Sequence, residues 1–442
     1  MKVMVVGGGA REHAICDAVA GSENVELYAF MHNRNPGIIR LAKNVKIEKE
    51  TNMDSVADFA VKNDIELAVV GPEAPLQAGI TDVLLDRGIK VCSPTKAAAR
   101  IETDKEWMRN LMKRYRIPGQ LRYKTFTDVE KAKGFIEQLE GEVAVKPIGL
   151  TGGKGVKVVG DHLPGIADAV EYAKEVIEKG IGGVNEVLIE EKVVGEEFTL
   201  QAFSDGETIF PMPAVQDHKR LLPGDKGPNT GGMGSYSDKN GLLPFLGKSE
   251  YEESTLILQK IVEALSREGC PFIGPIYGQF MLTVDGPRII EVNARFGDPE
   301  AMNVLPLLQD DFVDICLSLT EGSLNKKTIR FQKKATVCKY VVPEGYGIES
   351  MAHQPISVDE DAVKGSGALL FYASVNKEGE MIYTTSSRSL AVVGVGDSIS
   401  EAEQICEKGL THVKGDHIFI RHDIGTKELI ERRIAHMRQL CG

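Results

Sequence analysis

The stretch VKPIGLTGGKGVKVV, residues 145–159, places four glycines and Lys154 between two runs of β-branched residues. A Walker A phosphate loop needs G-x-x-x-x-G-K followed by Ser or Thr and then by a helix. Here Gly155 follows Lys154, Ile148 stands where the first glycine would be, and residues 156–159 continue as a strand. The stretch therefore predicts a glycine-rich loop at the tip of a β-hairpin.

Length and composition bound the class of protein. The chain has 442 residues, 42% of them hydrophobic and 26% charged, which is typical of a soluble globular protein with two to four domains. Its formal net charge of -12 argues against a nucleic-acid partner. Any phosphate-bearing ligand should therefore meet a local cluster of positive charge.

The cysteines and the length of the apolar runs indicate in which cellular compartment the protein resides. The seven cysteines are scattered, odd in number and never spaced as C-x-x-C, a pattern typical of reduced cytosolic thiols. Met1 leads directly into a strand, so we expect no signal peptide, and no 18-residue apolar run predicts a membrane span. The predicted location is the cytoplasm, without a membrane partner.

Apolar strand patterns alternate with helix patterns over residues 1–102, which predicts a βαβ domain with buried parallel strands. Ligands of such domains bind at the carboxyl ends of the strands. Three polar segments fall there: GGGAREHA (7–14), MHNRNPG (31–37) and GPEAPL (71–76). We therefore expect a ligand site at this edge.

A nicotinamide-dependent oxidoreductase is one alternative for this domain. Glu12 stands at the third glycine position of the dinucleotide fingerprint, and the second strand ends at residues 30–33 without a carboxylate for a ribose diol. Both features argue against a dinucleotide site. A structural alternative stays open, in which the glycines only let a strand turn into a helix.

The remaining patterns suggest two further domains. Residues 105–139 read as helix with a break at Pro118, followed by a strand-rich segment and a helix at 251–269. The last hundred residues read as short strands with one helix at 398–410. The expected domains are 1–102, 103–333 and 334–442.

The strand RIIEVNARF, residues 288–296, carries the strongest chemical signal. Because side chains alternate along a strand, Glu291, Asn293 and Arg295 should share one face. Carboxylate and amide oxygens suit Mg²⁺ shared with nucleotide phosphates, and a guanidinium suits a transferred phosphoryl group. A solvated strand face is the alternative. The opposite face is expected to be apolar and to consist of Ile290, Val292, Ala294 and Phe296.

The preceding strand supplies a third candidate metal ligand, Gln279. It joins the metal face only if it pairs opposite Glu291, so that Asp285 lies midway between them. We expect an odd loop with Gly286 in the left-handed conformation to produce this register, because a two-residue turn would put Gln279 on the apolar face.

Five motifs occur in a recognisable order: GGGAREHA, the glycine-rich loop, DHKR (217–220), GPNTGGMG (227–234) and RFGDPE (295–300). Together they resemble the glycinamide ribonucleotide synthetase (phosphoribosylamine-glycine ligase) family of the ATP-grasp superfamily along most of the chain. The resemblance implies an α/β and α+β multidomain fold. Its parts would be an amino-terminal nucleotide-fold-like domain, an ATP-grasp domain with a mobile lid around 120–195, and a small carboxy-terminal α+β domain.

The resemblance also implies a reaction in purine biosynthesis. ATP, with Mg²⁺ or Mn²⁺, would convert glycine into glycyl phosphate, and the amine of 5-phosphoribosylamine would then displace phosphate to form an amide. The implied partners are these small molecules, with the chain a monomer or weak dimer.

Family roles carry over to matching positions. The glycines are expected to close over the phosphates through backbone N–H groups, and the main chain around Glu190 to read adenine. The residues expected to bind ATP are Lys105, Lys146, Gly152, Gly153, Lys154, Gly155, Glu190, Glu191, Lys192, Val193 and Glu197. The residues expected at the substrate sites are Gly8, Gly9, Arg11, Glu12, Asn33, Pro72, Glu73, Asp217, Lys219, Arg220, Asn229, Thr230, Gly231, Gly232 and Met233. The expected catalytic residues are Arg295, Asp298 and Lys146, and the expected metal ligands are Gln279, Glu291 and Asn293.

The chain departs from the family pattern at three places. Gln279 is neutral where ATP-grasp enzymes usually have an acid, Met302 replaces a glutamine of many members, and HNRNPG (32–37) replaces a P-G-N-x-G loop. His218 is open to two interpretations, as a base or as a hydrogen-bonded structural histidine.

Two alternatives remain within the nucleotide-binding classes. A non-catalytic sensor could keep the clamp without the chemistry, but the presence of Glu291, Asn293 and Arg295 argues against it. An ATP-grasp ligase acting on formate or bicarbonate would share Lys146 and Glu291. It would not be expected to carry DHKR together with GPNTGGMG.

Overall fold

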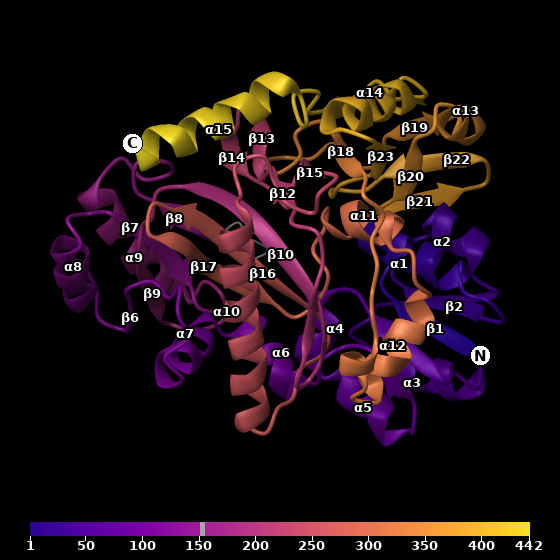
Figure 1. Ribbon diagram of the computed structural model, residues 1–442, viewed down its shortest axis with the longest axis horizontal. Helices are drawn as coiled ribbons and strands as arrows, with labels where there is room; N and C mark the ends of the chain where they lie inside the picture. The colour runs from indigo at the N-terminus through magenta and orange to yellow at the C-terminus, as the bar shows by residue number, and fades with distance from the viewer. Residues whose placement is uncertain (151–154) are drawn as a thin grey trace.

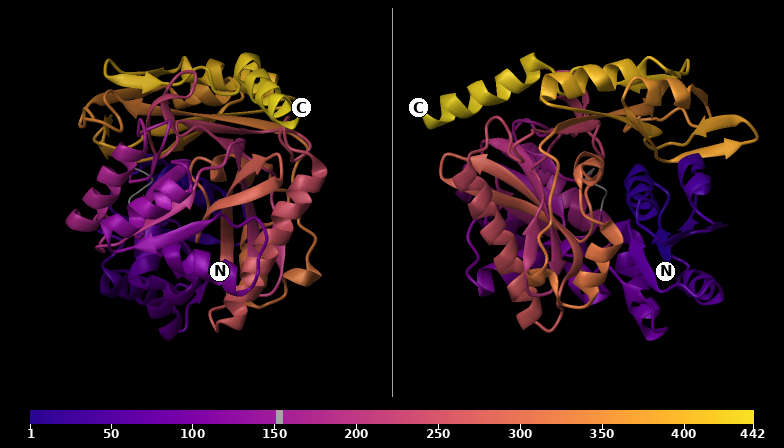
Figure 2. Two further views of the ribbon diagram at one scale, coloured as in Figure 1. Left: turned by 90° about the vertical axis from the view of Figure 1, so that its left-hand side faces the viewer. Right: turned by 45° about the vertical axis from the view of Figure 1, so that its right-hand side comes forward.

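The computed structural model describes residues 1–150 and 155–442, which form three regions (Figure 1). The amino-terminal region and the central sheets lie side by side, and the carboxy-terminal elements extend across both of them (Figure 2). In the described part of the chain, no helix is long and apolar enough to cross a membrane.

The amino-terminal region is a parallel sheet of five strands in the order β3-β2-β1-β4-β5. The strand order reverses between β1 and β4, and in sheets of this kind ligands bind beyond the carboxyl ends of the strands at that point. The strands are β1 (Lys2–Val6), β2 (Glu26–Met31), β3 (Asn44–Ile47), β4 (Leu67–Val70) and β5 (Lys90–Val91). The helices are α1 (Ala10–Ala20), α2 (Pro36–Leu41), α3 (Met53–Lys62), α4 (Glu73–Ala78), α5 (Ile80–Asp86) and α6 (Lys96–Thr103).

A small antiparallel sheet, in the order β6-β9-β7-β8, forms a lobe with two helices and a separate hydrophobic core. The strand β6 interrupts the predicted helix 105–139, and α9 lies in the segment predicted to be rich in strands. Local pattern agrees with the structure at both places, because β6 reads YKTF and the buried residues of α9 recur at helical spacing. The elements of this lobe are β6 (Tyr123–Phe126), α8 (Val129–Gln138), β7 (Val143–Pro147), β8 (Lys157–Val158), α9 (Ile166–Lys179) and β9 (Val187–Glu191). We call it the small lobe.

The antiparallel pairing of β7 with β8 confirms that the glycine-rich loop joins two strands of a hairpin. Alternation along β7 places Val143 and Val145 in the core of the small lobe, while Ala144 and Lys146 face a pocket. The loop residues 151–154 lie outside the described residues, and with them the predicted roles of Gly152, Gly153 and Lys154.

The small lobe faces a second antiparallel sheet, in the order β11-β10-β16-β17, which we call the base sheet. Its strands are β10 (Glu196–Asp205), β11 (Ile209–Pro211), β16 (Ile273–Thr283) and β17 (Gly286–Asn293). The helix α10 (Lys248–Arg267) contacts the strands of the base sheet, and α7 (Lys105–Arg114) packs against α10 and α6. After β17 the chain forms α11 (Ala301–Val304), a 3-10 turn (Leu305–Leu307), α12 (Phe312–Thr320) and a second 3-10 turn (Leu324–Lys326).

Gln279 pairs opposite Glu291 as predicted, but the turn does not produce this register. Thr283 pairs with Gly286, so the loop holds two residues, and the register shifts further along because Ile290 is an extra residue in β17. Such a bulge turns the following side chains to the other face. The predicted apolar position of Ile290 is therefore wrong, because its side chain lines the pocket beside Glu291.

A six-stranded sheet crosses the predicted border near residue 333. The strand β15, at the end of GPNTGGMG, pairs with β18, so Gly234 lies opposite Lys339. Strands predicted to belong to the ATP-grasp domain thus extend the carboxy-terminal sheet. Its strands are β12 (Gln216–Asp217), β15 (Gly234–Ser237), β18 (Ala335–Pro343), β20 (Leu369–Tyr372), β23 (Leu390–Gly396) and β25 (Ile418–Ile420).

The carboxy-terminal region holds three helices among the described residues where one was predicted: α13 (Glu360–Gly365), α14 (Ile399–Leu410) and α15 (Lys427–Cys441). Of the α15 side chains, Leu429 and Met437 are buried, which explains why its apolar pattern is faint. A further small sheet consists of β19 (Pro355–Val358), β21 (Val375–Glu378), β22 (Met381–Thr384) and β24 (Val413–Lys414). The hairpin of β13 (Arg220–Leu222) and β14 (Lys226–Asn229) lies under α15 (Figure 1).

Candidate active site

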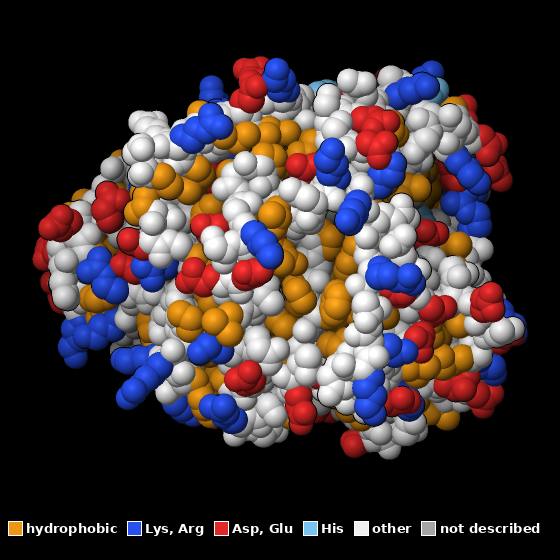
Figure 3. Space-filling view, in the orientation of Figure 1, with side chains coloured by type: hydrophobic (Ala, Val, Ile, Leu, Met, Phe, Trp, Pro, Cys, Tyr) orange, Lys and Arg blue, Asp and Glu red, His pale blue; other side chains and the backbone are white. Residues whose placement is uncertain are grey.

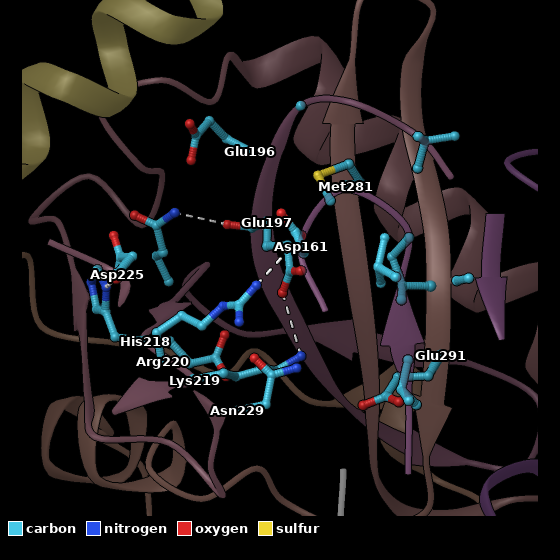
Figure 4. Close-up of a pocket in the computed structure, with 18 of the residues that line it drawn as sticks. Asp161, Glu196, Glu197, His218, Lys219, Arg220, Asp225, Asn229, Met281 and Glu291 are labelled. Atoms are coloured by element: carbon cyan, nitrogen blue, oxygen red, sulfur yellow. Dashed lines mark hydrogen bonds and ion pairs between the residues drawn. The ribbon is translucent and has the colours of Figure 1, made fainter. Parts of the chain in front are cut away.

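A cavity of about 510 Å³ lies between the small lobe and the base sheet. Its third wall comes from the DHKR and GPNTGG segments, so residues far apart in the sequence face one another across it (Figure 4). The predicted site residues that line it are Lys146, Glu190, Glu191, Lys192, Val193, Glu197, Asp217, Lys219, Arg220, Asn229, Thr230, Gly231, Glu291, Asn293, Arg295 and Asp298.

Lys146 is held by a buried carboxylate. Its Nζ lies 2.6 Å from Glu190 Oε2, and both side chains are almost inaccessible to solvent. Burial alone would raise the pKa of Glu190, but the charges of Arg109 and Lys146 outweigh it and lower the pKa to about 2. Glu190 therefore stays ionised and fixes the ammonium group of Lys146 at the pocket wall.

Arg109 is a site residue that the sequence analysis missed. From α7 it donates two hydrogen bonds to Glu190, with lengths of 2.6 and 3.1 Å, and its side chain is fully buried. It also donates at 2.9 Å to the carbonyl oxygens of Ile289 and Ile290, at the bulge. Arg109 thus joins the small lobe to the base sheet. No local pattern marks it, because its partners are distant in the sequence.

Glu291 lies among positive charges. Burial would raise its pKa, yet Lys219, Lys146 and Lys105 lower it, so the carboxylate is ionised at neutral pH. The Nδ2 of Asn293 lies 3.4 Å from Glu291 Oε1. The predicted pairing of these two side chains on one face is present in the structure.

Lys105, the first residue of α7, lies near the Glu291 carboxylate. The Asp104 side chain accepts a hydrogen bond from the Trp107 N–H and caps α7, which leaves Lys105 at its first position. Its Nζ donates to the Gly149 carbonyl at 2.9 Å, beside the glycine-rich loop. Burial lowers the pKa of Lys105, and Glu291 opposes this shift.

Arg295 connects the base sheet to the amino-terminal region. Its guanidinium lies 3.0 Å from Glu102 and 3.6 Å from Glu73, and these carboxylates raise its pKa despite burial. With Lys105, Glu291 and Asn293, these residues line a second cavity of about 100 Å³. Glu102, which lies at the end of α6, is another residue that the sequence analysis missed.

The carboxyl ends of β1 and β4 meet the RFGDPE segment. Arg11 is buried; it donates to Glu12 at 2.6 Å and to the Phe296 carbonyl at 3.2 Å. The Glu12 carboxylate accepts a hydrogen bond from the Gly9 N–H at the start of α1. Arg11 is therefore buried at the first turn of α1, and the Glu12 carboxylate occupies part of the N-terminus of this helix.

Asn33 and Gly8 pack directly together. A Cβ on Gly8 would lie 2.0 Å from Asn33 Oδ1, so this position requires glycine. Asn33 donates to the carbonyls of Gly8, Ala373 and Val375, and its Oδ1 is buried without a partner. Pro72 precedes α4 and packs near Gly7.

Asp298 is tied to the carboxy-terminal region. Its carboxylate accepts hydrogen bonds from the Tyr340 hydroxyl at 2.5 Å and pairs with Arg388 at 2.9 Å. Arg388 also donates to the carbonyls of Gly231 and Gly232. Both Asp298 oxygens thus have partners already, which fits a positioned acid better than a free proton carrier. Arg388 was missed because it lies about 90 residues beyond RFGDPE.

Asp217 faces the pocket with an unsatisfied oxygen. Its Oδ1 is buried without a hydrogen-bond partner, and burial raises its pKa to about 7. The adjacent His218 is buried, and its Nδ1 lies 3.1 Å from Asp225. Burial lowers the pKa of His218, and its buried ring between Asp225 and Tyr236 supports the structural interpretation.

At three predicted positions the contacts bear on the expected roles. The N–H groups of Glu191 and Lys192 already donate to the carbonyls of Arg122 and Glu142, so a reading of adenine by this main chain would use its other groups. Met233, just before β15, has a fully buried side chain in a hydrophobic core.

The predicted metal ligand Gln279 is hydrogen-bonded to neighbouring side chains in the structure. Its side chain is fully buried; Nε2 donates to Glu197 at 2.9 Å, and Oε1 accepts from Tyr277. Among the described residues, those lining the two cavities do not include it. The carboxylate of Glu300 lines the larger cavity nearby and accepts from the same Tyr277 at 3.0 Å.

Comparisons with known proteins agree with this geometry. Domains of phosphoribosylglycinamide synthetase match in order: the N domain over residues 1–102, the ATP-grasp (A) domain over 103–301 and the C domain over 336–427. A phosphoribosylamine-glycine ligase of Methanothermobacter thermautotrophicus is 54% identical over 440 residues and covers 100% of both chains. The chain belongs to the phosphoribosylamine-glycine ligase family.

Two solved structures also resemble this chain. The crystal structure of a phosphoribosylamine-glycine ligase from Thermotoga maritima is 27% identical, with a TM-score of 0.81, and covers 96% of this chain and 100% of that one. The biotin carboxylase domain of a Hydrogenobacter thermophilus 2-oxoglutarate carboxylase, solved with MgADP and bicarbonate, shares the fold at 16% identity and a TM-score of 0.74. It covers 99% of this chain and 93% of that one.

As an ATP-grasp member of the phosphoribosylamine-glycine ligase family, the chain should use ATP with a divalent metal. The described residues contain no group of three or more His, Cys, Asp or Glu side chains suited to a metal ion. Mg²⁺ bound to nucleotide phosphates needs few protein ligands. The ionised Glu291 with the Asn293 amide beside it fits such a shared site.

Proposed function

We propose that the chain ligates glycine to 5-phosphoribosylamine, giving glycinamide ribonucleotide, ADP and phosphate, in purine biosynthesis. The observation that carries this proposal is that three lysines surround the carboxylate of Glu291, which lines both cavities: Lys146 and Lys219 line the larger one and Lys105 the smaller. That arrangement suits a triphosphate with its metal. The DHKR and GPNTGG segments of the family form the opposite wall.

Glycyl phosphate is the proposed intermediate. An oxygen of the glycine carboxylate attacks the γ-phosphorus and ADP leaves; the amine of phosphoribosylamine then attacks the carbonyl carbon, and phosphate leaves as the amine loses a proton. Lys146, fixed by Glu190, and Arg295 are positioned to stabilise charge on the transferred group.

The remaining assignments follow from position. Glu291 and Asn293 would hold Mg²⁺ or Mn²⁺, whose charge would offset that of the phosphates. Glu197, at the rim of the larger cavity, would bind the ATP ribose, and Asp217 with its unpartnered oxygen would receive a substrate amine. Gly8, Gly9 and Asn33 would bind phosphoribosylamine at the strand edge.

We also propose a cytoplasmic location and a monomer or weak dimer. The seven cysteines are free, six of them buried, which is consistent with a reducing compartment. Lys, Arg, Asp and Glu side chains are interspersed over the face in Figure 3. This mixture of charge is consistent with the predicted lack of a nucleic-acid partner.

The function is tested by substrate dependence. Phosphate release from ATP should require both glycine and freshly prepared phosphoribosylamine, because only the amine completes the second step. Formate or bicarbonate in place of glycine should give only background release. Release supported by either of those acids without glycine would instead assign the chain to another ATP-grasp activity.

Arg11→Ala tests the site at the strand edge. Because Arg11 links α1 to the Phe296 carbonyl, its loss should disturb the phosphoribosylamine site and raise that KM about tenfold, with the KM values for ATP and glycine nearly unchanged. Steady-state kinetics with each substrate varied would measure this. A selective rise in the KM for ATP would place the nucleotide on the amino-terminal region.

A further inference from the structure

The hairpin β13–β14 is anchored at its tip by the carboxy-terminal segment. Asp225, at this tip, adopts a left-handed conformation with a φ of 56°. Its carboxylate lies 3.0 Å from Arg421 and 2.7 Å from Arg432, and it also pairs with Arg433. With His218 at 3.1 Å, four donors converge on one carboxylate, and three of them come from the last 22 residues of the chain.

Backbone contacts strengthen this anchor. The Gly224 N–H donates to Asp423 at 2.9 Å, and the Gly224 carbonyl accepts from Arg432 at 3.3 Å. Arg421 is fully buried and donates to the Arg220 carbonyl at 2.9 Å. The hairpin is thus fixed at its tip and at its first strand.

The helix α15 also contacts the base sheet. Glu196 at the start of β10 is buried, and its carboxylate lies 2.9 Å from Arg433 and 2.6 Å from His436. Because α15 binds the hairpin and β10 together, it sets the distance between them. Figure 4 shows Glu196 and Asp225 on the same side of the pocket as the helix.

The other side of the hairpin contacts the small lobe. The Arg220 guanidinium lies 3.4 Å from Asp161 Oδ2 and 3.2 Å from His162 Nε2, in the turn that follows β8 (Figure 4). Lys219, one residue earlier, reaches Glu197 of the base sheet at 3.4 Å. Arg220, Asp161, His162, Lys219 and Glu197 line the larger cavity, as do Asp225, Glu196 and Arg433. Among the anchoring residues of the carboxy-terminal segment, Arg421, Asp423, Arg432 and His436 lie outside its lining.

We infer that Asp225 is a positioning residue that couples α15 to the small lobe through Arg220 and thereby sets the affinity for ATP. This inference rests on the proposed function, because it takes the pocket to be the ATP site. With the tip anchored, Arg220 is held where it bridges to Asp161 and keeps the small lobe over the base sheet. Without the Asp225 contacts, the tip of the hairpin is mobile, and the bridge from Arg220 to Asp161 forms less readily. Binding of ATP must then also order the hairpin, and the cost of this ordering weakens the binding.

The test is a double-mutant cycle in the full-length chain. Asp225→Asn and Arg220→Gln should each raise the Kd for a non-hydrolysable ATP analogue and the KM for ATP about tenfold. For Asp225→Asn, kcat at saturating ATP should change less than about twofold. Because both act on one bridge, the double variant should be no weaker than the worse single variant. Calorimetry and steady-state kinetics give the two readouts.

Matched controls distinguish coupling between Asp225 and Arg220 from a general loss of stability. Lys427→Ala removes an exposed residue of α15 that pairs with Glu431, and it should leave both constants unchanged. If Asp225→Asn does not fold, Arg432→Gln replaces it; this half-exposed side chain contacts the same tip, and a rise of about threefold is expected.

Two results would overturn the inference: an unchanged ATP constant in Asp225→Asn, or effects that multiply to about a hundredfold in the double variant. A lower melting temperature and lower kcat with unchanged ATP affinity would show a purely structural role. Failure of the proposed function would appear separately, as wild-type protein that binds the analogue but does not consume glycine.

Discussion

Glu291→Gln is expected to lower kcat by about two or more orders of magnitude while the protein stays folded. Glu291 is the one predicted metal ligand that is a carboxylate lining both cavities, and the surrounding lysines keep it ionised. Glutamine keeps the shape of the side chain and removes its charge, so the loss should appear in turnover more than in the melting temperature. Single-turnover ADP formation and thermal unfolding would measure the two effects.

Asn293→Ala is the matched comparison on the same strand. It removes a neutral ligand beside Glu291, so a milder loss is expected. Near-normal turnover of Glu291→Gln at saturating Mg²⁺ would remove Glu291 from the mechanism.

Arg109→Met should destabilise the protein by about 3–5 kcal/mol, the usual cost of breaking a buried ion pair. The change leaves Glu190 with Lys146 as its remaining charged partner and frees the carbonyls at the bulge. Displacement of Lys146 should also weaken ATP binding. Chemical denaturation would measure the stability, and titration with an ATP analogue would measure the binding.

A neighbouring ion pair provides the control. Arg122 pairs with Glu191, one residue beyond Glu190, but the Arg122 side chain is 70% exposed. Arg122→Met should therefore cost less than about 1 kcal/mol. Equal losses from the two substitutions would contradict the role assigned to Arg109. Arg109→Lys should recover only part of the stability, because an ammonium cannot form the two-pronged contact with Glu190.

Local patterns predicted much of the fold because they report directly on burial. The central parallel strands β1, β2 and β4 are apolar and buried on both faces. The amphipathic helices at 251–269 and 398–410 carry a clear period of 3.6. Alternation along the strand also predicted the polar face with Glu291, whereas Lys146 on β7 was expected from the family resemblance. The helix α15 escaped this reasoning because few of its side chains are buried.

By itself, the sequence determined the family through its ordered motifs, which pointed to the lysines, and it predicted that Glu291, Asn293 and Arg295 share a strand face. Only the tertiary structure decided the bulge at Ile290 and the hydrogen bond from Gln279 to Glu197. The same holds for the contacts of Arg109, Arg388 and Asp225. These features depend on partners tens to hundreds of residues away, and in the case of Arg109 on backbone carbonyls, which every residue carries. Side-chain type and spacing encode alternation and charge, whereas the pairing of distant groups arises only when the chain is packed.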